Sequence, residues 1–171
     1  GADYGKNYGT DVFGIPGTHN LELYRYLPGS GIEHVLCRHE QGAVYAADGY
    51  ARSGAGVAAV IVTSGPGLLN AATGIANAYA DRVPMIVIAP VIERGRERRD
   101  VGWMHEVKDQ RAALDAVAAW SESAASVEDA AALVHRAFME WGAGESRPVV
   151  INVPHDVLVY PALEPQPGFE H

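Results

Sequence analysis

A carboxyl group at position 40 lies where a short apolar run ends and a helical pattern begins. Residues 32–37 are typical of a strand, and residues 41–52 keep small side chains at helical spacing, which predicts a closely packed helix. A carboxylate at such a junction lies on the carboxyl edge of a sheet, where open α/β folds bind ligands. Apolar surroundings strengthen the hold of a carboxyl group on its proton, so Glu40 is a candidate acid or base.

Two glycine-rich segments, residues 14–19 and 64–70, each follow a predicted strand. Their glycines allow unusual backbone angles and the close approach of a ligand, although a plain strand-to-helix turn explains them equally well. The second segment lacks the Gly-Lys-Ser/Thr ending of a phosphate loop, and Asn70 stands where a dinucleotide fingerprint has its third glycine. It is therefore not expected to hold a pyrophosphate by itself.

Histidines near predicted loop edges are a second source of acid–base chemistry. For His39 the alternative is a packed or hydrogen-bonded structural role, and for His105 it is the start of a surface helix. Cys37 falls inside a predicted strand, which is typical of a small buried residue rather than a nucleophile. One cysteine and scattered histidines do not have the spacing of zinc ligands, so no metal ligand is predicted.

Apolar runs that favour strands alternate with helical periodicity along the chain. Ser126 and Asp129 have the spacing of a helix start before the last helix. The expected strands are 11–15, 32–37, 57–62, 85–89 and 149–153, and the expected helices are 21–27, 41–52, 68–79 and 130–141. This order predicts a doubly wound α/β fold with a mostly parallel sheet and helices on both faces. In such a sheet the turns at 16–19, 38–40, 64–67 and 90–105 converge on one edge, which favours a functional role for Glu40.

Composition limits the class of partner. The 171 residues are 48% apolar, enough for one domain with a real core. A formal net charge of −8 argues against nucleic acid or an anionic membrane surface and favours a small molecule or a protein. No secretory signal or membrane span is visible, so a cytoplasmic location is expected.

Two segments fall outside the alternating pattern. Residues 93–100 mix four arginines with three acids, which is typical of a solvated loop. Residues 161–171 contain three prolines and are expected to begin a linker after a domain of residues 1–160.

Five blocks resemble a known family in order and approximate spacing. VFGIPG, RHEQGAVYAADGYAR, TSGPGLLNAATGIANAYADRVPMIVIAP, HEVKDQ and RPVVINVPHDV together span residues 11 to about 157. They resemble the pyrimidine-binding domain of thiamine diphosphate-dependent enzymes, in the branch with acetolactate synthase, benzoylformate decarboxylase and related 2-oxoacid decarboxylases. The HEVKDQ block is closer to decarboxylases of guanidino-type 2-oxo acids.

The resemblance implies roles for individual residues. Glu40 would hydrogen-bond N1′ of the cofactor's aminopyrimidine and so promote loss of the proton at thiazolium C2, and His105 would be a further catalytic residue. Thr18 and His19 would lie over the substrate. The residues implied to contact the cofactor, besides Glu40, are Pro16, Gly17, Gly65, Pro66, Gly67 and Asn70.

The resemblance also implies partners. The substrate would be a small 2-oxo acid, and Mg²⁺ with the diphosphate-binding domain would come from another part of the enzyme, in a second subunit of a homo-oligomer. The small residues of helix 68–79 are expected to face that subunit. Two alternatives remain, a separately encoded α subunit of a two-chain decarboxylase and a non-catalytic binding module with the same fold.

Overall fold

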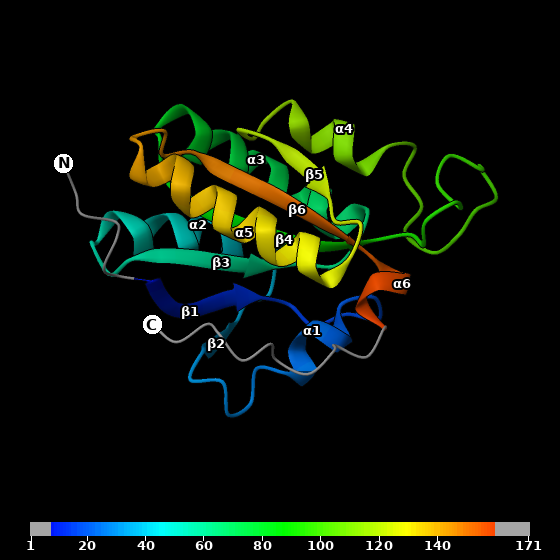
Figure 1. The fold of residues 1–171 in the computed structure, drawn as a ribbon, viewed down its shortest axis with the longest axis horizontal. Helices are drawn as coiled ribbons and strands as arrows, with labels where there is room; N and C mark the ends of the chain where they lie inside the picture. Colours follow the sequence, from blue (N-terminus) through cyan, green and yellow to red (C-terminus); the bar gives the residue numbers. More distant parts are fainter. Residues whose placement is uncertain (1–7, 160–171) are drawn as a thin grey trace.

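The computed structural model describes residues 8–159, which form one parallel six-stranded sheet with helices on both faces (Figure 1). The strand order is β2-β1-β3-β4-β6-β5, and every pairing is parallel. The strands are β1 (Tyr8–Gly14), β2 (Glu33–Leu36), β3 (Val57–Ile61), β4 (Met85–Val91), β5 (Ser121–Ser123) and β6 (Pro148–Pro154). The doubly wound fold is therefore confirmed, while the predicted linker at 161–171 lies outside the described residues.

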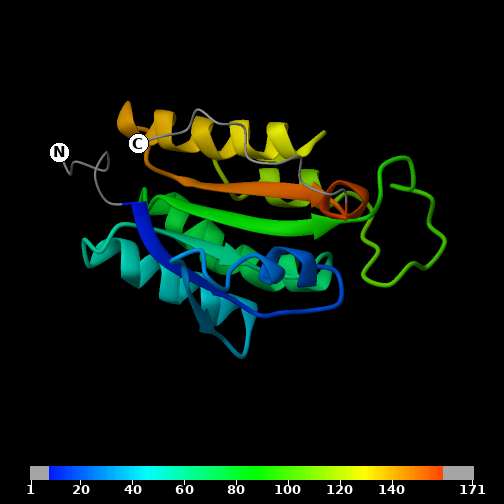
Figure 2. The ribbon, with the colours of Figure 1, turned by 60° about the horizontal axis from the view of Figure 1, so that its bottom comes forward.

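The helices divide between the two faces of the sheet. Figure 2 shows α5 above the sheet and α2 and α3 below it, with β4 pointing toward the end that carries a long loop. The other strands point the same way because every pairing is parallel. The helices are α1 (Leu21–Arg25), α2 (Glu40–Arg52), α3 (Pro66–Ala80), α4 (Gln110–Asp115), α5 (Val127–Gly142) and α6 (His155–Leu158). None of the helices within residues 8–159 combines the length and the apolar run needed to cross a bilayer.

Alternation along the central strands builds two cores. Val87 on β4 and Val150 on β6 belong to the core that includes residues of α2, α3 and α4. Ile86 and Val149, one position away on the same strands, belong to the core that includes Trp141 of α5. Because both faces of these strands are buried, they read as continuous apolar runs in the sequence.

Helices α2 and α3 pack so closely that a glycine is required between them. A Cβ atom added to Gly74 would lie 2.7 Å from Cγ1 of Val44, and Ala71 and Ala78 on α3 are fully buried. Ala71, Gly74 and Ala78 therefore serve packing within the chain, which corrects the expectation for these three residues, while Ala72 and Ala76 are half-buried. Contact of α3 with a second subunit stays a prediction. The outward face of α3 carries larger groups, including Leu69 and Tyr79.

Helices α5 and α2 begin after N-cap residues whose side chains accept a backbone hydrogen bond, Ser126 and His39. Ser126 accepts a hydrogen bond from the backbone N–H of Asp129 at 3.1 Å, which confirms the predicted start of α5. His39 is the N-cap of α2, and its Nδ1 accepts from the backbone N–H of Gln41 at 3.1 Å. This capping bond supports the structural alternative for His39.

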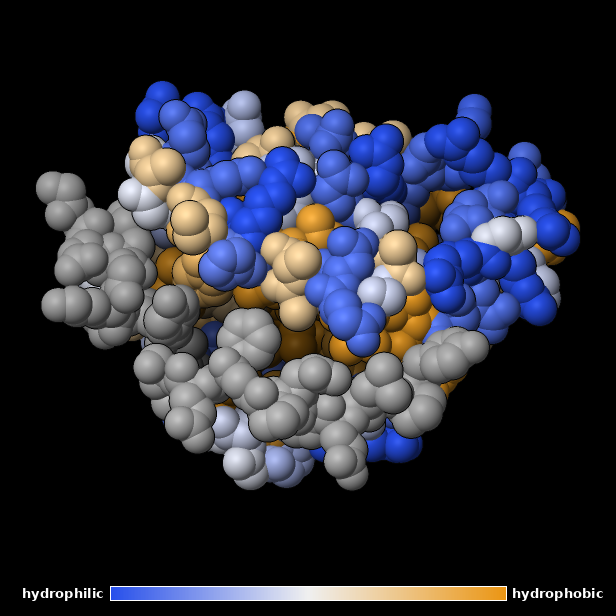
Figure 3. Space-filling model, in the orientation of Figure 1, coloured by the Kyte–Doolittle hydropathy of each residue, from blue (hydrophilic) through white to orange (hydrophobic). Residues whose placement is uncertain are grey.

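Strand β2 differs from the prediction of a uniformly buried strand. It is the edge strand of the sheet, and Leu36 has 67% of its surface exposed. The sequence also gave no signal for β5, which is three residues long and polar, or for the short helices α4 and α6. The loop between β4 and α4 has no helix or strand, as predicted for the charged segment, and it forms a hydrophilic projection at the right of Figure 3.

Candidate functional site

The order of the strands reverses between β1 and β3, and the turns that follow these strands meet there. Asn20 shapes the turn after β1, because its buried side chain accepts from the N–H of Gly17 at 2.6 Å and donates to the carbonyl of Ile15 at 3.0 Å. The turn after β3 runs into α3 through Gly65, Pro66 and Gly67. These two turns carry most of the predicted site residues.

Glu40 lies in the first turn of α2, half-buried beside the start of α3. Its Oε2 atom accepts a hydrogen bond from Nδ2 of Asn70 at 3.0 Å. A Cβ atom on Gly67 would lie 2.5 Å from Cγ2 of Thr63 and 3.1 Å from Oε1 of Glu40, so only glycine allows these two side chains to pack against the turn. The structure thus brings Glu40 next to Gly67 and Asn70, which lie 27 and 30 residues further along the chain.

Thr63 connects the two glycine turns. Added Cβ atoms on Gly17 and Gly67 would lie 3.2 Å and 2.5 Å from its side-chain carbons. Its Oγ1 atom is buried and has no hydrogen-bond partner within the described part of the chain. This hydroxyl lies on the Gly17 side, 3.3 Å from the added Cβ atom, whereas the methyl group of Thr63 lies toward Gly67. A buried polar group without a partner is rare in a folded protein.

A second set of side chains gathers on the other side of the turn after β3. Oγ of Ser64, a buried residue, lies 2.6 Å from Nδ1 of His19 and 3.4 Å from Nδ1 of His105. The ring centroids of His19 and His105 are 5.1 Å apart, and those of His19 and His155 are 6.1 Å apart. Burial, and then the neighbouring charges of His105 and His155, lower the pKa of His19.

Backbone packing holds His105 against the turn. His105 has a φ of 63°, a rare value for a residue with a side chain, and Gly65 has a φ of 55°. A Cβ atom on Gly65 would lie 2.1 Å from the carbonyl oxygen of His105, so this contact needs glycine. Glu106 stabilises the same loop, since its carboxylate accepts from the N–H groups of Gly102 and Trp103 at 2.6 and 3.0 Å.

Two buried amide side chains, Gln110 and Asn152, connect the strand ends at the carboxyl edge of the sheet. Gln110 accepts from the N–H of Gly65 at 2.7 Å and donates to the carbonyl of Pro90 at 2.9 Å and to Oδ1 of Asn152 at 2.8 Å. Asn152 in turn donates to Oγ of Ser121 at 2.9 Å. These bonds join the ends of β3 and β4 to β5 and β6, so they hold the turn after β3 in a fixed position relative to the neighbouring strands.

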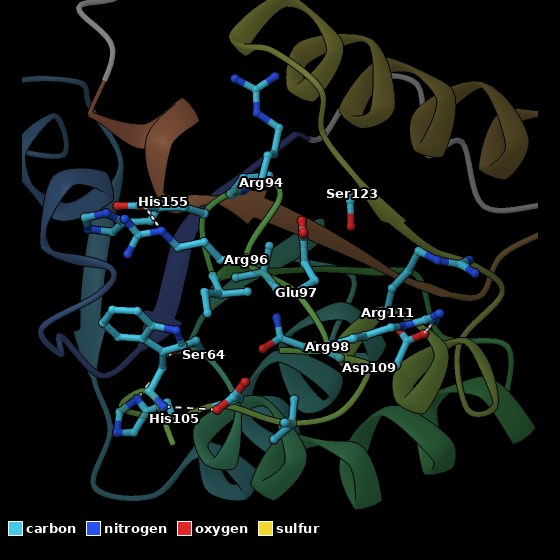
Figure 4. A pocket seen from close by; sticks show the side chains of 18 of the residues that line it. Ser64, Arg94, Arg96, Glu97, Arg98, His105, Asp109, Arg111, Ser123 and His155 are labelled. Carbon is cyan, nitrogen blue, oxygen red and sulfur yellow. Dashed lines mark hydrogen bonds and ion pairs between the residues drawn. The ribbon is translucent and has the colours of Figure 1, made fainter. Parts of the chain in front are cut away.

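The loop between β4 and α4 encloses a cavity of about 510 Å³ with the histidines on one side (Figure 4). Ion pairs order this loop: Arg94 binds Asp156 at 2.7 Å, and Arg98 binds Asp109. The N–H of Ala112 and the Arg98 guanidinium lower the pKa of Asp109. Burial raises the pKa of Asp156, but the bonds from Arg94 outweigh it and the net shift is downward.

The predicted residues thus occupy two neighbouring sets rather than one pocket. His19 and His105 line the cavity, whereas Glu40, Gly67 and Asn70 lie outside it. Pro16 and Thr18 are exposed and do not line the cavity either. Residues that the sequence reasoning did not select are Asn20, Thr63, Ser64, Gln110, Asn152 and His155. Ser64 and His155 each come two residues after a predicted strand, so the edge rule alone could have found them.

Residues 5–113 match the family model described as thiamine pyrophosphate enzyme, N-terminal TPP binding domain. The chain belongs to this family. Thiamine pyrophosphate is the compound called thiamine diphosphate above, and the sheet and its turns are the scaffold of that domain.

Relatives with named activities agree with this assignment. The chain is 50% identical over 156 residues to a probable 2-ketoarginine decarboxylase of Pseudomonas aeruginosa, covering 91% of this chain and 28% of the relative. It is 40% identical over 157 residues to an acetolactate synthase large subunit of Haemophilus influenzae, covering 91% and 26%. It is 39% identical over 148 residues to the isozyme 3 large subunit of Escherichia coli, covering 86% and 25%. The chain therefore spans little more than a quarter of the relatives it matches.

The residues present fit the pyrimidine half of the cofactor. The half-buried carboxyl group of Glu40 lies beside the glycine turn after β3, is held at Oε2 by Asn70, and accepts no hydrogen bond at Oε1 from the described residues. Within residues 8–159, no group of three or more His, Cys, Asp or Glu side chains is arranged to hold a metal ion. The fit therefore concerns the ring and not the diphosphate.

Proposed function

We propose that this chain is the domain of a thiamine diphosphate-dependent enzyme that holds the cofactor's aminopyrimidine and activates it through Glu40. The proposal rests on the different surroundings of the two oxygen atoms of the Glu40 carboxyl group. Oε2 is fixed by Asn70, while Oε1 of this half-buried side chain receives no hydrogen bond from the described residues. A carboxyl group held at one oxygen and open at the other can exchange a proton with a ring nitrogen.

The chemistry of the cofactor defines what the protein must do. When bound, thiamine diphosphate supplies the electron sink for cleaving the bond between the carboxyl and keto carbons of a 2-oxo acid. Glu40 would donate and accept the proton at the pyrimidine N1′ atom. The glycines of the turn after β3 would allow the ring to approach the backbone.

The histidine side of the turn would receive the substrate. His105 would act as a catalytic acid or base, and His19 and Thr18 would contact the 2-oxo acid, as the family resemblance implies. The loop of residues 92–109 supplies both acidic and basic groups to the same cavity. A polar side chain on the substrate, such as the guanidinium of 2-ketoarginine named for the Pseudomonas relative, would find carboxylates there.

The diphosphate and Mg²⁺ would be bound by a further domain of the same enzyme, contributed by a second copy in a homo-oligomer. Support comes from the short span of the match, 25–28% of the relatives' length. The cytoplasmic location expected from the sequence stays a prediction.

This chain alone should bind the cofactor weakly. Its contacts are to the pyrimidine ring only, and these are too few to offset the freedom lost on binding. We expect a Kd no lower than about 1 mM for thiamine diphosphate with Mg²⁺, or about −4 kcal/mol. In ¹H–¹⁵N NMR spectra the shifted amides should be those of Glu40, Gly65, Gly67 and Asn70. Micromolar binding, or shifts concentrated on another face, would contradict the proposed site.

Self-association should use the outward faces of α2 and α3. Tyr45, Leu69 and Tyr79 are exposed there, with 42%, 42% and 39% of their surfaces accessible. We expect light scattering to show a mass that rises toward a dimer with concentration, and Leu69→Glu to abolish the rise. Val159→Glu, at an exposed apolar residue beyond α6, is the matched control. A strictly monomeric mass at high concentration would refute the use of this face.

A further inference from the structure

Three imidazoles from separate segments converge at the end of β3. His19 comes from the turn after β1, His105 from the loop after β4, and His155 from the first position of α6. In Figure 4, His105, Ser64 and His155 lie along one side of the pocket, while Asp109 and Arg111 lie on the opposite side. All three histidines line the cavity, and His155 and Ser64 have no role in the function proposed above.

Ser64 couples two of these rings. Its hydroxyl carries one proton and can donate it to only one of the two Nδ1 atoms, which lie at 2.6 and 3.4 Å. To bond to the same oxygen, the other ring must carry a proton on its own Nδ1. The tautomers of the two rings are therefore linked, because only one of them can accept from Ser64 at Nδ1 while the other donates from its own Nδ1.

The cluster has no acidic partner. Among the described residues none of the three rings forms an ion pair with a carboxylate. The acids that line the cavity are each engaged elsewhere: Glu93 by Arg96, Asp109 by Arg98, Glu97 by the N–H of Gly95, and Glu106 by backbone N–H groups of the loop. Asp156, beside His155, is paired with Arg94. Lys108 on the same loop is exposed and adds positive charge to the cavity lining. A group of basic rings without a carboxylate is a site for an external anion.

We propose that His19, His105 and His155, arranged around Ser64, form a binding site for one carboxylate group, and that the cluster takes up a proton when that carboxylate binds. The site adds His155 and Ser64 to the residues that recognise the ligand. Only the identity of the anion, the carboxylate of a 2-oxo acid, rests on the proposed function.

The electrostatics of the cluster agree with this site. The neighbouring rings help to disfavour the charged form of His19 in the absence of a ligand. A bound carboxylate would offset that repulsion, so proton uptake and anion binding strengthen each other by linkage. His105 is held in place for this purpose at a strained φ of 63°, with Gly65 and the Glu106-capped loop fixing its backbone.

Histidine NMR in this chain, without cofactor, tests the site. The imidazole signals are titrated from pH 5 to 8 with pyruvate as the probe and with sodium chloride at equal ionic strength. We expect pyruvate to raise the titration midpoint of His19 by about one unit, a tenfold preference for the protonated cluster, and chloride to leave it unchanged. Equal shifts in both salts, or none with pyruvate, would overturn the proposal.

Matched variants separate a binding role from a structural one. His155→Asn should weaken pyruvate binding about tenfold, the loss expected for one hydrogen bond to a charged group, and Ser64→Ala, which removes the hydroxyl shared by His19 and His105, should reduce the shift that pyruvate causes at His19. His135→Asn, at an exposed histidine of α5, should change neither. Unaltered pyruvate binding in His155→Asn would remove His155 from the site. Such a failure would leave the role of Glu40 untouched, because that role is measured on the cofactor.

Discussion

Gly65→Ala is expected to lower the free energy of unfolding by roughly 2–5 kcal/mol, the sum of backbone strain and overpacking. The first cost arises because Gly65 has a φ of 55° and a ψ of −113°, a combination that side chains disfavour. The second arises because the new Cβ atom would lie 2.1 Å from the carbonyl oxygen of His105, a backbone atom that cannot rotate away. The turn after β3 and the loop carrying His105 would then have to separate.

Urea denaturation followed by circular dichroism measures this loss. Gly54→Ala is the matched control, because Gly54 has a φ of 82° but no atom within 4 Å of the added Cβ. It carries the backbone cost alone, about 1–2 kcal/mol. Equal destabilisation by the two substitutions would show that the contact between Gly65 and His105 is unimportant.

The sequence predicted the sheet well because its central strands are apolar on both faces. Val87 and Ile86 point into different cores, so no polar alternation interrupts the run, and the same holds for Val150 and Val149. The edge strand β2 was less predictable, since periodicity does not reveal which strand lies at an edge. β5 has only three residues and owes its pairing to β6 rather than to its own pattern.

The site could be predicted only in part. The sequence shows which segments reach the carboxyl edge of the sheet, but not which of their side chains contact one another there. The rule that ligands bind at the carboxyl edge placed Glu40, His19 and His105 at one end of the sheet. It could not show that the turn after β3 separates Glu40 from the two histidines. Gln110 was hidden for another reason: its role depends on Asn152, 42 residues away, and no local pattern links the two.

Glu40→Gln is expected to slow activation of the cofactor by roughly 10²–10⁴-fold, the usual effect of removing one positioned acid–base group. The amide has the same shape and can still accept a bond from Asn70, so folding should be retained. It cannot exchange a proton with a ring nitrogen, which is the property the mechanism requires. Glu33→Gln, at an exposed glutamate on β2, is the matched control and should have no effect.

The most direct test is the rate at which the C2 proton of thiamine diphosphate exchanges with deuterium in the enzyme that contains this domain. Exchange is quenched with acid at millisecond intervals and read by ¹H NMR, which reports on activation before any substrate reacts. We predict that Glu40→Gln lowers this rate at least 100-fold while Glu33→Gln leaves it unchanged. An exchange rate in Glu40→Gln equal to that of the unaltered enzyme would contradict the role of Glu40 and with it the proposed function.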